Sequence, residues 1–201
     1  MVNGHGGRKV AGSLATSIFL IASGSWSAQG VPQAGSPQKP ASPASKGTQK
    51  TEPLFVSDDK SFSIWMPGTP KRENIDTPSV FGPVVFVIYQ LRQSNSAYAI
   101  GYTDFPADKV AHTSPDKLLN MSSEGAHKRY GKGVIKDMKV TYHGLQGREI
   151  VCRIDGPQKA QIDMRVFLVK NRVYTMNVVH LQAEEMKGEI SHFLESFKVL
   201  K

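Results

Sequence analysis

Two rows of apolar residues alternate with polar ones between Gln161 and His180, and they predict a β-hairpin. A period of two is the spacing of a strand with one covered face. We expect a three-residue loop at 170–172, which sets Leu168 opposite Tyr174 and brings both rows to one face. A two-residue loop would instead send the rows to opposite faces. The rows are Ile162, Met164, Val166 and Leu168, then Tyr174, Met176, Val178 and His180.

The segment from Pro83 to Leu91 is apolar at nearly every position. Such a run is typical of a strand that is covered on both faces. We therefore expect Val85 and Phe86, which point to opposite sides, to be hidden from water. A sheet with this strand inside it needs a layer on each side.

Shorter patterns predict the remaining strands, which end at Pro, Gly or polar turns. The polar segment Lys71–Thr77 is expected at an edge, where its charges discourage pairing with other molecules. The further strands are expected at Lys60–Met66, Ala97–Phe105, Val134–Tyr142 and Arg148–Asp155.

Two segments have the pattern of helices. Ser114 is a suitable N-cap with Pro115 at the first helical position, and Gly131 or Gly133 ends that helix. The second helix is expected within 184–197. Their inward stripes are Leu118, Leu119, Ser122, Ala126 and Tyr130, then Met186, Ile190, Phe193, Leu194 and Phe197.

Together these elements predict an α+β fold. Strands joined by short turns form an antiparallel sheet, and the doubly apolar strand requires cover on both sides. We expect a three-layer α/β/α sandwich with a central, mainly antiparallel sheet of about seven to eight strands. The mid-chain helix covers one side and the C-terminal helix covers the other.

The first quarter of the chain has a different composition. Residues 1–28 have the pattern of a secretory signal peptide, with Arg8 and Lys9 before a short apolar run and small residues at its end. Residues 29–53 are rich in Pro, Ser, Gly, Ala and Lys, which predicts a disordered linker. A single domain is expected over 54–201. The protein is therefore expected to be exported, to a periplasm, the outside or a lumen, with no membrane span after cleavage.

Charge and cysteine content narrow the function. From Pro53 onward there are 20 Lys and Arg against 16 Asp and Glu, a net of +4. With export and no nucleic-acid-binding motif, this mild basicity points to anionic surfaces or a protein partner rather than nucleic acid. The lone Cys152 alternates with Ile150 and Ile154, so we expect a buried, inert thiol.

No motif nominates a catalytic centre. The histidines fall in separate elements without metal-ligand spacing, and no nucleotide-binding loop or nucleophile elbow occurs. We predict no catalytic residues, metal ligands or cofactor, while leaving open a site assembled from distant residues.

Two charged features are candidate sites. A cationic cluster could dock an anionic or acidic partner, or form a solvated surface at a helix C-terminus. Alternation also predicts a structural ion pair between Glu149 and Arg165 on neighbouring strands. The cluster contains Lys128, Arg129, Lys132, Lys136 and Lys139.

The opening FSIWMPGTP, the strand exit around Tyr98, Tyr102, Asp104 and Pro106, and the terminal FLESFKV resemble the PsbP-like fold family. That group includes the extrinsic photosystem II subunit and non-photosynthetic relatives. The resemblance covers about residues 54–201 and implies an exported, non-enzymatic module that binds or assists a larger assembly.

Two other functions stay open at this point. One is a carrier of a small apolar or amphiphilic ligand, lined by Met164, Met176 and Met186. The other is a hydrolase or metal enzyme, in which a pocket would unite two or more of His112, His143 and His180 with an acid.

Overall fold

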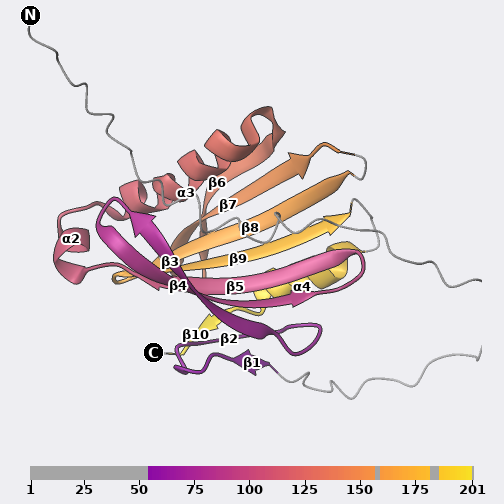
Figure 1. Cartoon of the computed structure of the whole chain (residues 1–201), viewed down its shortest axis with the longest axis horizontal. Coiled ribbons are helices and arrows are strands. Elements are labelled where there is room, and N and C mark those ends of the chain that lie inside the picture. The colour runs from indigo at the N-terminus through magenta and orange to yellow at the C-terminus, as the bar shows by residue number, and fades with distance from the viewer. Residues whose placement is uncertain (1–53, 157–158, 182–185, 201) are drawn as a thin grey trace, which may run out of the picture.

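The computed structural model describes residues 54–156, 159–181 and 186–200. Its centre is a seven-stranded sheet in the order β3-β4-β5-β9-β8-β7-β6, with every neighbouring pair antiparallel (Figure 1). The strands are β3 (Lys71–Ser79), β4 (Gly82–Arg92), β5 (Ser96–Asp104), β6 (Val134–Tyr142), β7 (Leu145–Ile154), β8 (Ala160–Val169) and β9 (Arg172–Leu181). The expected signal peptide and linker lie outside the described residues.

The helices follow the capping signals in the sequence. In α3 (Pro115–Tyr130) the Ser114 side chain accepts a hydrogen bond from the Lys117 amide. Gly131 ends that helix with a φ of 51°, a conformation that glycine adopts without strain. The other helical segments are α2 (Ala107–Ala111), η2 (Gly131–Gly133) and α4 (Lys187–Glu195).

The two long helices pack on opposite faces of the sheet, as predicted. We call these the α3 face and the α4 face. Leu119 and Ala126 of α3 share a core with Ile150 and Met164, whereas Phe193 of α4 packs in the other core. In β9 the α3-face core contains Val173 and Val179, and the α4-face core contains Tyr174, Met176 and Val178.

A second, three-stranded sheet completes the cover of the α4 face. It consists of β1 (Phe55–Val56), β2 (Phe62–Ile64) and β10 (Lys198–Val199), in the order β1-β2-β10. The first predicted strand therefore lies outside the central sheet. All three residues of β2 are buried because this strand lies among α4, β10 and the central sheet.

The expected register of the hairpin between β8 and β9 is wrong. Leu168 pairs with Val173, so the loop has two residues, and Lys170 takes the left-handed φ of 56°. The apolar rows consequently point to opposite faces. Alternation alone allowed both registers. Phe167, which lies between the residues of the first row, is fully buried in the α4-face core together with the second row, and this burial favours the observed register.

The expectation that Val85 is hidden is also wrong, although Phe86 is buried. Val85 is 46% exposed on the α4 face, and cover there begins at Val87. The nine residues of α4 span only about 13 Å, at 1.5 Å per residue. The helix and the small sheet therefore leave the start of β4, next to the turn from β3, uncovered on this face.

No helix within the described part of the chain is long and apolar enough to cross a membrane.

Candidate functional site

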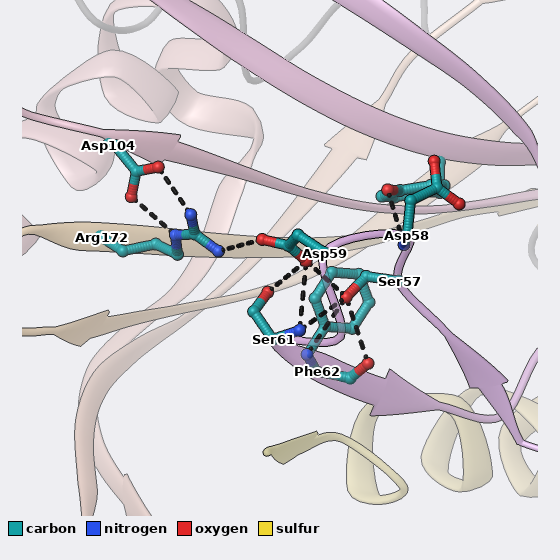
Figure 2. A network of polar contacts seen from close by, with 8 residues as sticks. Ser57, Asp58, Asp59, Ser61, Phe62, Asp104 and Arg172 are labelled. Carbon is teal, nitrogen blue, oxygen red and sulfur yellow. Dashed lines mark hydrogen bonds and ion pairs between the residues drawn. The ribbon is translucent and has the colours of Figure 1, made fainter. Parts of the chain in front are cut away.

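Arg172, at the start of β9, is the centre of a polar network that joins the two sheets (Figure 2). Its Nε and Nη2 each donate to a different oxygen of Asp104, both at 2.6 Å. Its Nη1 donates to Asp59, also at 2.6 Å, in the turn between β1 and β2. The guanidinium stacks over the Tyr102 ring at 3.9 Å from its centroid. One side chain thus ties that turn to β5 and β9.

Asp59 also organises its own turn. Its Oδ1 accepts hydrogen bonds from the Ser57 hydroxyl, the Ser61 hydroxyl and the Ser61 amide. Partial burial by itself would raise the pKa of Asp59, but the bonds from Arg172 and the serines outweigh it and hold that pKa well below its usual range. The carboxylate therefore stays ionised, and its oxygens stabilise the turn and its contact with Arg172.

A second network holds the C-terminus of α4. Glu149 lies opposite Arg165, and Arg165 Nε donates to its Oε2 at 3.0 Å. Arg165 Nη1 donates to the Leu194 carbonyl at 3.3 Å, while the Tyr142 hydroxyl donates to the next carbonyl. Burial opposes ionisation of Glu149, but Lys136 and Arg165 lower its pKa overall. A cation at this helix end also complements the helix dipole.

A third network lies beneath α3. Arg148 donates from Nε and Nη2 to Asp137 Oδ1, and from Nη1 to Asn120. Ser123 and His127, one turn apart on α3, both bond to Asp137 Oδ2. Burial opposes ionisation of Asp137, yet these hydrogen bonds lower its pKa overall. The serine and histidine each bond to the carboxylate rather than to each other, so this arrangement fastens α3 to β6 and β7.

The buried His180 pairs with the half-buried Asp163 on the α4 face. His180 Nε2 lies 2.8 Å from Asp163 Oδ2, and Nδ1 lies 2.9 Å from the Leu181 carbonyl. A carboxylate and a carbonyl only accept, so both ring nitrogens must donate, which requires the imidazolium. Burial favours the neutral ring, but these bonds outweigh it and raise the pKa of His180.

The other titratable candidates remain apart. His112 caps the end of α2, His143 lies in the turn after β6, and His192 stacks edge-on against Trp65. Within the described ranges no three His, Cys, Asp or Glu side chains are grouped as ligands of a metal ion. Cys152 is buried, and burial together with two nearby aspartates raises its pKa to about 11.

The structure divides the predicted cationic cluster. Lys128 and Arg129 lie in the last turn of α3, and Lys132 lies in η2. Lys136 pairs with Glu149, on the α4 side of β6. Lys139 bonds at 2.7 Å to Asp116 on α3, hence on the other side of the same strand. The cations thus flank the β6 edge on both faces instead of forming one flat patch.

Beside this edge an open groove of about 340 Å³ separates the first turn of α3 from β6 and β7. Pro115 contributes exposed apolar surface, the nearly buried Leu119 lies in the wall, and the Asp116–Lys139 ion pair lies across the groove. The groove is lined by Ser114, Pro115, Asp116, Leu119, Lys139, Val140, Thr141, Gln146 and Gly147.

Sequence reasoning missed both the Arg172 network and the groove. Arg172 was expected in a loop, and no prediction gave Asp59 a role. The partners of Arg172 lie 68 and 113 residues away along the chain, so no local spacing connects them. The methionines proposed to line a ligand cavity are divided between the two cores, Met164 in one and Met176 and Met186 in the other.

Comparison with known proteins gives similarity of fold alone. No family model matches the chain, and no curated protein matches it. Among solved structures, cyanobacterial PsbP (CyanoP) from Synechocystis sp. PCC 6803 is 11% identical with a TM-score of 0.45, over 78% of this chain and 98% of that one. LpqN of Mycobacterium tuberculosis, described as involved in cell envelope biogenesis, is 12% identical with a TM-score of 0.47, over 73% and 89%.

A structure from Bacteroides thetaiotaomicron VPI-5482 is 8% identical with a TM-score of 0.46; the match covers 74% of this chain and about half, 48%, of that one. One of these structures, CyanoP, is a PsbP protein, and PsbP-like is the fold family that the sequence resembles. The mixed α+β class and the mainly antiparallel sheet are those predicted. At these TM-scores and identities, the similarity does not indicate a function for this chain.

Proposed function

We propose that this chain is an exported, non-catalytic binding module that assists a larger assembly, and that its contact surface is the groove between α3 and β6. The single observation that carries the proposal is the groove itself, which is open and carries apolar surface from α3 next to an exposed ion pair. The buried and half-buried charges described above are held in networks that fasten helices and sheets, so they serve the fold. Export rests on the signal-peptide pattern of residues 1–28.

A protein partner is favoured over an anionic membrane surface. Membrane docking needs cations that face one plane, but Lys136 and Lys139 point to opposite sides of β6. A protein segment can reach both sides of a strand, and the apolar residues of the groove offer it a contact that a lipid headgroup does not use.

Site-specific photocrosslinking tests this proposal. A crosslinking residue replaces Thr141, which lines the groove, and in a matched control it replaces Asn74 on β3, at the far edge of the sheet. With an envelope fraction of the source organism, the Thr141 position is expected to yield a discrete crosslinked protein that the Asn74 position does not. The same products from both positions, or none from either, would contradict the proposal.

A further inference from the structure

We infer that the partner binds by strand addition: an extended acidic segment of another protein pairs with the outer edge of β6. This inference rests on the proposed function and names its partner class. β6 ends the order of the central sheet, so among the described strands nothing pairs with its outer side. The pairing of β6 with β7 is irregular between Val134 and Lys136, but from Lys136 to Tyr142 the register is continuous. Along residues 136–142 the outer edge therefore presents backbone donors and acceptors that an extended segment can satisfy.

The two edges of the sheet differ in their charges. β3 mixes both signs and contains Pro78, which is the usual protection of an edge against added strands. On β6, Asp137 is held beneath α3 by Arg148, so the accessible charges are Lys136 and Lys139. Met138, between them, is 46% exposed. The β6 edge thus combines cations with an exposed apolar side chain.

The alternation of β6 defines the sequence that fits. A residue opposite Lys136 and one opposite Lys139 are three positions apart in the added strand, and they point to opposite faces. Acidic residues at these two positions would meet a lysine on each side, with an apolar residue between them opposite Met138. The side chains of Lys136 and Lys139 are 46% and 65% exposed, and an ammonium group has three donors, so each can bind a second carboxylate.

A second copy of this chain is a poorer partner for the same edge. Pairing β6 with itself would bring its lysines and the cations of η2 and α3 next to their own copies, and like charges across a strand pair are unfavourable. The groove adds a reason for a separate partner, because it can receive a side chain that the added strand directs towards α3. The geometry and the charge therefore favour an acidic segment of another protein.

Labelled decapeptides test the inference by fluorescence anisotropy. The probe has Glu-Val-Val-Glu at its centre and threonine elsewhere. One control replaces both glutamates by lysine, and another carries N-methyl groups on alternate amides, which keeps the charge and removes strand pairing. We expect the probe to bind the wild-type domain, the lysine peptide to bind at least tenfold more weakly, and the methylated peptide not to bind.

A pair of double variants locates the site. K136Q/K139Q should weaken probe binding by about tenfold, since the probe loses both of its ion pairs with the domain. K71Q/R92Q, on the strands of the opposite edge, should leave it unchanged. Equal binding of the methylated peptide, equal loss in both double variants, or self-association of the domain without peptide binding would overturn the inference. A partner crosslinked at Thr141 in that case preserves the proposed function, whereas the absence of any crosslink overturns the function itself.

Discussion

Arg172 shows how a single side chain can fasten a peripheral sheet to a central one. It forms two bonds with Asp104, one with Asp59, and a stacked contact with Tyr102. Lysine cannot reproduce this fork, because its ammonium is a point charge without a planar face. The turn before β2 therefore depends on an arginine at this position.

Replacing Arg172 by methionine should lower the free energy of unfolding by about 1–3 kcal/mol, because two carboxylates lose their partner while one of them remains half-buried. Urea unfolding of the wild type and the variant measures this difference. Arg72→Met is the matched control: it breaks an ion pair with Asp58 that is 44% and 68% exposed, so it should cost less than about 0.5 kcal/mol. Equal losses in the two variants would show that the Arg172 network has no special role.

The His180–Asp163 pair makes stability depend on pH. The folded pKa of His180 lies above the value of about 6.5 for an unfolded chain. Its contribution is therefore fully present below that pH and is lost as the pH rises through the folded pKa. His180→Gln should cost more stability at about pH 5.5 than at about pH 9, as measured by urea unfolding at both values.

Asp163→Asn is the control for this dependence. Without the carboxylate the imidazolium loses its main partner, so the extra cost of His180→Gln at low pH should disappear in the Asp163→Asn background. A cost that is the same at both pH values in the wild-type background would mean that His180 is neutral in the folded protein.

Local sequence identified the residues whose role follows from alternation. The burial of Cys152 and the register that sets Glu149 opposite Arg165 depend on the side that each residue of a strand faces. The Arg172 network depends on the position of a distant turn, the one between β1 and β2, next to β9. That is settled by packing of the small sheet, and no spacing in the sequence encodes it.

At the scale of elements, glycines mark where two strands leave no room for a side chain. A Cβ on Gly147 of β7 would lie 2.3 Å from the Val166 carbonyl oxygen and 2.4 Å from the Phe167 ring. A backbone oxygen cannot move aside without disturbing the pairing of β7 and β8. Gly188, in the first turn of α4, is exposed and has nothing within 4 Å of a Cβ.

Gly147→Ala should therefore destabilise the domain by about 2 kcal/mol or more, through a forced shift of the β7–β8 pair. Gly188→Ala should stabilise it by up to about 1 kcal/mol, because alanine has the higher helix propensity. Thermal and urea unfolding of both variants give the signs directly. A neutral Gly147→Ala would mean that these strands are not as close as described.

The hairpin between β8 and β9 shows the limit of pattern analysis for elements. The existence of both strands was predicted correctly, but the loop length was wrong by one residue. Apolar residues occur on both faces of β8 and β9, so a one-residue slip still buries apolar side chains. The observed register also requires a left-handed Lys170, a conformation that nothing in the sequence favours for lysine.

At the scale of the whole molecule, the central sheet has a separate core on each face. Helix α3 covers one core, and α4 with the small sheet covers the other. This arrangement and the α+β class followed from the doubly apolar β4 and from the stripes of α3 and α4. The small sheet did not follow, because its strands have two or three residues and join the two ends of the domain. Its limited reach is also why Val85 remains exposed.

The same arrangement leaves the edge at β6 as the place where we propose that a partner binds. Amide hydrogen exchange on the free domain and on its complex with the crosslinked partner tests that claim most directly. We predict slower exchange in the complex along β6 and in the first turn of α3, with β3 unchanged. Protection along β3, or no change at β6, would contradict the account.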